Sequence, residues 1–338
     1  MEKIKVAIVG AGILGKIHAQ AYAESEKAEL VYICDVVKEK AKELAKQYNC
    51  DYTIENQKIA DDPKIKAVSV ATPDFAHREV TLKMIEAGKD VLVEKPLATS
   101  LEDAQEIVKA AARKKVKLMV DFQNRWNPLF VQAKQTISKG EIGTPVMAYV
   151  RLSNPLSVPL EMLSWASKSG PEWFLLPHTV DLVHWLLEKK PMEVYATGKK
   201  GVLKNRGIDV YDAIQALVRF EDDSFVTFET SWILPNSWPT LVDFKLMLLG
   251  TKGRIGVEGD RQGIDIATGK FSWPFVLGLQ YTYGKNLGFF KEPILHFVDC
   301  ISKNKTPMCS GAHGLATTRV IEAIIRSIEE KMVVKIES

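Results

Sequence analysis

A short apolar run followed directly by three spaced glycines is the feature that most constrains the fold of this chain. Residues 5–9 are too few for a buried helix but suit a buried parallel strand, and Gly10, Gly12 and Gly15 follow as G-x-G-x-x-G. In such a unit the first glycine permits the tight turn, the second lets the backbone approach a pyrophosphate, and the third lets a helix pack closely. The N-terminus of that helix then presents free N–H groups and a positive dipole end to phosphates. The segment therefore predicts a dinucleotide-binding unit.

A second apolar run, residues 29–34, ends at Asp35, 20 residues after Gly15. In dinucleotide-binding folds a carboxylate at about this distance accepts hydrogen bonds from the adenosine ribose. A carboxylate also repels a 2′-phosphate, and no arginine follows immediately, so the sequence favours NAD over NADP, although Lys38 offers a cation to a phosphate. The alternative is that Asp35 only caps the next helix.

Composition places the chain among ordinary globular proteins. At 338 residues, 46% hydrophobic and 26% charged, it is long enough for two domains with separate cores. The net charge of +3 includes no basic block, so nothing predicts a nucleic-acid or membrane-surface partner. We find no apolar stretch of transmembrane length and no room for a signal peptide before the first strand. The four cysteines lack metal-ligand spacing, so we expect free thiols, a cytoplasmic location and no metal.

Strand-like and helix-like segments alternate through the first 120 residues, which is typical of a doubly wound parallel sheet. Further strands are expected at residues 65–71, 90–94 and 116–120, and helices at residues 38–48, 75–88 and 100–115, the last capped by Ser100. Ligands bind such sheets beyond the carboxyl ends of the strands. Five segments lie at such ends: residues 10–15, Asp35, residues 72–73, residues 94–96 and residues 123–125.

The second part of the chain is expected to be an α+β domain with a mostly antiparallel, open sheet. Residues 213–220 and 225–232 form β-type runs joined by a hairpin signal, and strand-like runs also occur at residues 145–152 and 241–249. We expect one domain at residues 1–122 and a second at residues 123–338. The C-terminal helix is a candidate to pack back on the first domain. One face of the open sheet is free to pair with another subunit, which predicts a dimer or tetramer.

Lys95 is the first candidate for catalysis. It follows a predicted strand on the ligand-binding edge, where an ammonium group can hold a substrate hydroxyl. Burial would shift its pKa toward neutrality and suit it to proton transfer. The alternative is an exposed loop lysine without a catalytic role.

Taken together, these motifs resemble the glucose–fructose oxidoreductase / inositol dehydrogenase / MocA family over nearly the whole chain. The resemblance is carried by the glycine loop, residues 71–73 with His77, residues 94–96, residues 124–128, residues 178–181 and the pattern of residues 310–336. It implies an N-terminal Rossmann domain, a C-terminal domain whose sheet makes oligomer contacts, and a nicotinamide in the cleft between them. Typical substrates are sugars, inositols and related polyols, oxidised or reduced at one carbinol carbon.

The chain departs from this family at its second catalytic motif. His178 and Asp181 align, but Phe174 occupies the position of the family's catalytic aspartate, and Pro177 replaces the usual glycine. The resemblance then leaves Lys95 and His178 to handle the proton, unless Glu172 or a substrate group substitutes. His178 has a suitable unperturbed pKa for a base, or is merely an N-cap. Asp181 is expected to orient His178 or the backbone.

Two sets of candidate contacts complete the reading. The expected cofactor-binding residues are Gly10, Gly12, Ile13, Leu14, Gly15, Asp35, Thr72, Pro73, His77, Glu94, Lys95, Asn124 and Arg125. The expected substrate-binding residues are Lys95, Trp126, Asn154, Trp165, Phe174 and His178, although each aromatic is alternatively ordinary core. His18 is expected to pack on the first helix, although the family resemblance also allows it a place near the cofactor. His77 is expected to support the nucleotide loop.

The function predicted from the sequence is an NAD(P)-dependent oxidoreductase, with NAD preferred, acting on a carbinol or carbonyl of a sugar-like or cyclic polyol. Two other readings stay open at this point, because a fold does not fix a function. One is a redox-neutral glycosidase that uses tightly held NAD. The other is a non-catalytic NAD or sugar sensor, which the Phe174 departure supports.

Overall fold

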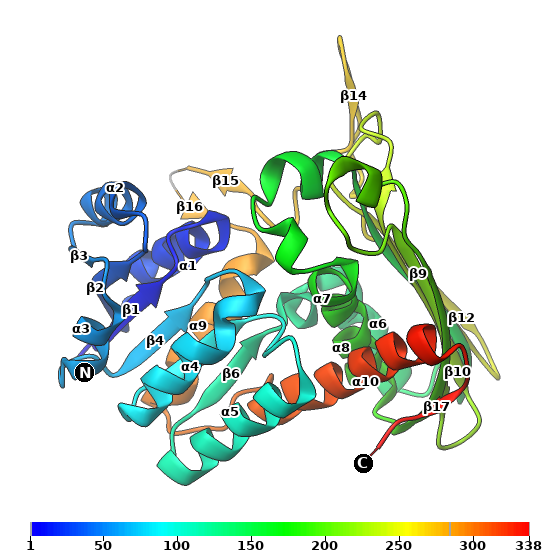
Figure 1. The fold of residues 1–338 in the computed structure, drawn as a ribbon, viewed down its shortest axis with the longest axis horizontal. Helices are drawn as coiled ribbons and strands as arrows, with labels where there is room; N and C mark the ends of the chain where they lie inside the picture. Colours follow the sequence, from blue (N-terminus) through cyan, green and yellow to red (C-terminus); the bar gives the residue numbers. More distant parts are fainter. Residues whose placement is uncertain (1, 284, 338) are drawn as a thin grey trace. The chain divides into compact units, whose positions relative to one another are not determined.

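The computed structural model describes residues 2–283 and 285–337, which form two compact units (Figure 1). Unit 1 comprises residues 1–123 and 279–318, and unit 2 comprises residues 124–278 and 319–338. Residues 279–318 thus belong to the N-terminal unit, although the sequence reading placed them in the second domain.

Unit 1 is built on a six-stranded parallel sheet of order β3-β2-β1-β4-β5-β6. Its strands are β1 (Ile4–Val9), β2 (Ala28–Cys34), β3 (Asp51–Thr53), β4 (Ala67–Val70), β5 (Asp90–Glu94) and β6 (Leu118–Asp121). The order reverses between β1 and β4. In sheets of this kind ligands bind at the carboxyl edge beside such a reversal. β4, β5 and β6 are buried at every position, as expected for parallel strands covered on both faces.

Four helices of this unit lie close to where the local sequence predicts them, and α3 was not predicted. These helices are α1 (Ile13–Glu24), α2 (Lys38–Tyr48), α3 (Asn56–Asp61), α4 (His77–Glu86) and α5 (Leu101–Lys114). The Ser100 hydroxyl accepts the Asp103 N–H at 3.1 Å, so the predicted N-cap of α5 is confirmed. The C-cap residues of α2 and α5, Asn49 and Lys115, have the left-handed backbone conformation that is common at helix C-termini.

Residues 279–318 add a further helix, α9 (Glu292–Ser302), to the sheet formed by the first 122 residues. α9 packs against α1, β5 and β6, and Lys27 pairs with Asp299 at 2.6 Å. The Val120 N–H donates to the Cys309 carbonyl at 2.8 Å, which ties the chain before α10 (Gly311–Glu330) to the edge strand β6. α10 begins in unit 1 and ends in unit 2.

Unit 2 is organised on a seven-stranded sheet of order β12-β11-β7-β10-β9-β8-β17. Its strands are β7 (Pro145–Pro155), β8 (Pro191–Lys199), β9 (Ala213–Phe220), β10 (Phe225–Leu234), β11 (Asp243–Gly250), β12 (Arg254–Glu258) and β17 (Val334–Lys335). The β9–β10 hairpin is confirmed, and all pairings are antiparallel except β7 with β10. Sequence reasoning missed β8 and β12, although Val194 and Ala196 in β8 and Ile255 and Val257 in β12 alternate with more exposed residues.

One face of this sheet carries the core of unit 2. α6 (Pro128–Ser138), α7 (Pro171–Phe174) and α8 (Leu176–Leu187) pack with the second half of α10 around the buried side chains of β7 to β11. Alternate residues of β8 and β9 point to the other face, where Tyr195 and the directly opposite Leu217 are about half exposed. Within the described residues, no helix is long and apolar enough to cross a membrane.

Candidate active site

The three glycines of the loop in unit 1 have different roles. Packing requires two of them, and the third leaves space for a ligand. A Cβ on Gly10, whose φ is +107°, would lie 2.3 Å from the Ala71 carbonyl oxygen, and one on Gly15 would lie 1.9 Å from the Gly10 carbonyl oxygen. Both glycines are therefore needed for the turn and for the close approach of α1. A Cβ on Gly12 meets no atom within 4 Å, so the fold itself does not require this glycine. The free space beside it fits a pyrophosphate at the N-terminus of α1.

Asp35 is held against this loop. One carboxylate oxygen accepts the Ala11 N–H and the other accepts the Val37 N–H, both at 2.8 Å. The N-cap of α2 is Val37, so the alternative of Asp35 as a simple helix cap is wrong. Next to these polar groups, Ile13 is 59% and Val36 is 90% exposed. A fixed carboxylate flanked by exposed apolar side chains fits an adenosine ribose and its base.

His77 joins two of the predicted ligand segments. One ring nitrogen lies 2.6 Å from the Pro96 carbonyl oxygen, and the other lies 3.0 Å from the Thr72 carbonyl oxygen. The side chain is 1% exposed and begins α4. It therefore bridges the loop after β4 and the loop after β5, as expected for a residue that supports the nucleotide site.

Lys95 follows β5 and is buried, with 6% of its surface exposed. Burial lowers the pKa of its ammonium group, while the carboxylates of Glu94, Asp74 and Asp121 oppose this shift. The alternative of an exposed loop lysine is therefore wrong. A desolvated amine near carboxylates is suited to proton transfer or to holding an oxygen.

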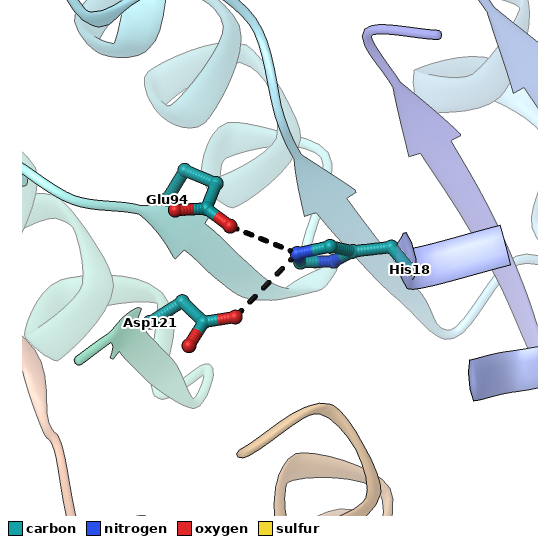
Figure 2. A group of neighbouring side chains, drawn as sticks. All are labelled: His18, Glu94 and Asp121. Atoms are coloured by element: carbon teal, nitrogen blue, oxygen red, sulfur yellow. Dashed lines mark hydrogen bonds and ion pairs between the residues drawn. The ribbon is translucent and has the colours of Figure 1, made fainter. Parts of the chain in front are cut away.

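His18 differs from the expectation of a residue that merely packs on its helix. Its Nε2 lies 3.1 Å from Glu94 Oε1 and 3.5 Å from Asp121 Oδ2 (Figure 2). Its Nδ1 lies 2.9 Å from the Ser69 hydroxyl. Burial disfavours the imidazolium, but the two carboxylates outweigh it and raise the pKa of His18 to about 9. Sequence reasoning missed Asp121 and Ser69 because their partner is distant in the chain.

In unit 2, Arg125 and Asp181 form a buried bidentate ion pair. The guanidinium donates to the two carboxylate oxygens at 2.9 and 2.6 Å, and both side chains are 2% exposed. Burial raises the pKa of Asp181, which Arg125 opposes. Asp181 was expected to orient His178 or the backbone, but it holds Arg125. Asn124 and Trp126 lie in the same short 3₁₀ turn, Gln123–Trp126, before α6.

The remaining predicted substrate residues lie around α7 and α8. His178 is half-buried in the first turn of α8, whose N-cap is Leu175, so the reading of His178 as the N-cap is wrong. The Phe174 ring centroid lies 6.0 Å from that of Trp165 and 5.6 Å from that of the fully buried Trp232. The Asn154 amide, also buried, donates to the Leu241 carbonyl at 2.6 Å.

Comparison with known proteins agrees with this geometry. Residues 4–122 match the model of an oxidoreductase family with an NAD-binding Rossmann fold, and residues 134–336 match the model of the C-terminal α/β domain of the same family, Gfo/Idh/MocA. The chain belongs to this family. It is accordingly an NAD-dependent oxidoreductase, and the expected cofactor and fold class are confirmed.

Two dehydrogenases and one solved structure are similar to this chain over nearly their full length. The chain is 27% identical to inositol 2-dehydrogenase of Rhizobium meliloti over 98% of this chain and 99% of that protein. It is 26% identical to scyllo-inositol 2-dehydrogenase (NAD(+)) of Bacillus subtilis, over 99% and 97% respectively. The crystal structure of a putative myo-inositol dehydrogenase from Sinorhizobium meliloti superposes with a TM-score of 0.85 at 26% identity, over 99% of this chain and all of that one.

Proposed function

We propose that this oxidoreductase transfers hydride between NAD and one carbinol carbon of a cyclic polyol or sugar, with Lys95 and His178 acting on the oxygen. The observation that carries the proposal is the buried Lys95 ammonium at the carboxyl end of β5, in the sheet that bears the glycine loop. The names of the relatives, inositol 2-dehydrogenase and scyllo-inositol 2-dehydrogenase, support an inositol-like substrate.

In the oxidation direction the protein has to remove a proton from the hydroxyl while a hydride leaves the carbon. Bound NAD supplies the hydride acceptor. We assign His178 as the base that takes the hydroxyl proton and Lys95 as the donor that holds the oxygen and stabilises its developing negative charge. The reverse reaction uses the same two groups, with His178 returning the proton to the carbonyl oxygen.

For the cofactor we propose the contacts expected from the sequence. Gly12, Ile13 and Leu14 would offer backbone N–H groups to the pyrophosphate, with Gly10 and Gly15 shaping the loop and Asp35 binding the ribose. The other proposed cofactor contacts are Thr72, Pro73, Glu94, Lys95, Asn124 and Arg125, with His77 holding the two loops. Arg125 would contact the cofactor while its guanidinium stays bonded to Asp181.

For the substrate we propose Lys95, His178, Trp126, Asn154, Trp165 and Phe174. Phe174 offers no proton acceptor, and its ring packs between those of Trp165 and Trp232. This packing supports an apolar contact with a ring face of the substrate rather than a role in proton transfer.

The test is the change in absorbance at 340 nm with NAD or NADP and a panel of inositols, sugars and sugar acids. Turnover with NAD that falls by at least about 100-fold in Lys95→Ala and His178→Ala is the expected result. Lys109→Ala and His313→Ala, at exposed positions, are the matched controls. Tight NAD binding with no turnover on any substrate would instead favour the sensor, and turnover without added NAD would favour the redox-neutral glycosidase. The family is described as one of oxidoreductases, which favours neither the sensor nor the redox-neutral glycosidase.

We also propose that the protein is a homo-oligomer, a dimer or tetramer, through the open face of the unit 2 sheet. Exposed Tyr195, Leu217 and Leu249 support this, because apolar side chains on a sheet face gain from a covering partner. Light scattering of the purified protein, compared with a Leu217→Lys variant, tests it. We also propose a boundary between the domains near residues 122 and 123, with residues 279–318 returning to the N-terminal unit. A cytoplasmic location, which four free cysteines support, is a proposal as well.

A further inference from the structure

The buried cluster of His18, Glu94 and Asp121 joins three elements that meet at the carboxyl edge of the unit 1 sheet. His18 lies on α1, the helix that begins at the glycine loop, while Glu94 ends β5 and Asp121 ends β6 (Figure 2). All three residues are at most 5% exposed. Glu94 is also the residue directly before Lys95, so whatever holds Glu94 acts on the Lys95 backbone.

The contacts of His18 use both ring nitrogens. Nε2 faces the two carboxylates at 3.1 and 3.5 Å, and Nδ1 faces the Ser69 hydroxyl, which in turn lies 2.6 Å from the Tyr22 hydroxyl. Because a hydroxyl can accept a hydrogen bond, both ring nitrogens can donate, as they do only in the imidazolium.

The charges in this cluster balance only if His18 carries a proton. Two carboxylates buried side by side repel each other, and burial together with the Glu94 charge raises the pKa of Asp121 to about 6. The imidazolium and the Lys95 ammonium are the positive charges that oppose this shift. On the Nδ1 side of the ring, Ser69 and Tyr22 add no charge near neutral pH.

We propose that His18 is a positioning residue: as an imidazolium bonded to Glu94 and Asp121, it clamps the helix of the cofactor loop to the strand ends that carry Lys95. The clamp keeps both carboxylates ionised and fixes the start of the Lys95 loop relative to the N-terminus of α1. His18 itself touches neither cofactor nor substrate in this scheme. The consequence for catalysis rests on the proposed function, but the existence of the clamp does not.

The first experiment needs no substrate. Nuclear magnetic resonance of the protein labelled with ¹³C and ¹⁵N in histidine, assigned by loss of the His18 signals in His18→Gln, reports the charge of each ring. The expected result is an imidazolium at pH 7.5 that loses its proton only near pH 9. Asp121→Asn removes one of the two carboxylates and should lower the pKa of His18. A neutral His18 ring at pH 7.5, or a ring whose pKa does not respond to Asp121→Asn, would overturn the proposal.

The second experiment measures the kinetic consequence. His18→Gln should lower kcat by about 10- to 100-fold while the Kd for NAD and the KM change by less than about threefold, because small displacements of a catalytic group act mainly on the chemical step. His313→Gln, an exposed histidine in the same unit, is the matched control. The double variant His18→Gln/Asp121→Asn removes one charge of each sign, so it should fold and recover part of the lost kcat even if His18→Gln alone is unstable.

The outcomes separate the two proposals. If the wild-type protein oxidises no polyol, the proposed function fails, and the resonance measurement still decides whether the clamp exists. If turnover is found but His18→Gln has the kcat of the wild type, the positioning role is refuted. The same three side chains have donor atoms within 4.8 Å of one another, as in a metal site. A stoichiometric divalent metal that copurifies with the protein and is lost in His18→Gln would also refute the clamp.

Discussion

Replacing Asp181 with asparagine should strongly destabilise unit 2. The change keeps the shape of the side chain but removes the negative charge that faces the Arg125 guanidinium, to which it is bonded at 2.6 and 2.9 Å. Both partners are 98% shielded from water, so solvent cannot replace the lost charge. Breaking one side of such a buried pair costs about 3–5 kcal/mol.

A destabilisation of that size is readily measured. For a unit of this length, about 2–4 °C is lost per kcal/mol, so the midpoint of thermal unfolding of unit 2 should fall by about 6–20 °C. Near-ultraviolet circular dichroism reports the transition, because the aromatic cluster of Phe174, Trp165 and Trp232 lies in this unit. Glu330→Gln makes the same chemical change in the exposed Arg326–Glu330 pair of the same unit and should leave the midpoint nearly unchanged.

The double replacement of Arg125 by methionine and Asp181 by leucine should recover most of the lost stability, since two apolar groups leave no buried charge unpaired. Equal midpoints for Asp181→Asn and Glu330→Gln would refute the reasoning, because they would mean that the buried pair contributes no more than an exposed one.

Two further predictions concern unit 1. Gly12→Ala should leave thermal stability unchanged or slightly higher but weaken NAD binding, measured by calorimetry, whereas Gly15→Ala should cost at least about 2 kcal/mol, because its Cβ would overlap the Gly10 carbonyl. Loss of stability in Gly12→Ala with normal NAD affinity would contradict the assignment of the free space to the cofactor. The raised pKa of His18 means that folding takes up a proton between pH 6.5 and about 9, so its contribution to stability is complete below pH 6.5 and is lost as the pH rises to about 9. The free energy of unfolding, measured by denaturant titration at each pH, should fall across this range in the wild type. It should fall less steeply in His18→Gln.

Local sequence predicted much of the fold because the relevant signals are short-range. The glycine spacing after an apolar run, the alternation of strands and helices, the Ser100 cap and the β9–β10 hairpin each depend on residues within one element or its turn. Asp35 was found the same way, since its distance from Gly15 is fixed by the length of α1 and β2.

The tertiary structure decided the features that join distant parts of the chain. Nothing in the sequence around His18 indicates that two carboxylates, 76 and 103 residues later, surround its ring, because strand order rather than sequence separation brings α1, β5 and β6 together. The pairing of Arg125 with Asp181 likewise required the packing of α8. Residues 279–318 belong to the first unit because α9 packs on β5 and β6. Hydrophobic periodicity shows that α9 has an apolar face, but not which sheet that face covers. Local sequence thus determined most of the elements and the chemistry that the chain carries, while burial and long-range contacts determined the charge state and partner of the buried polar groups.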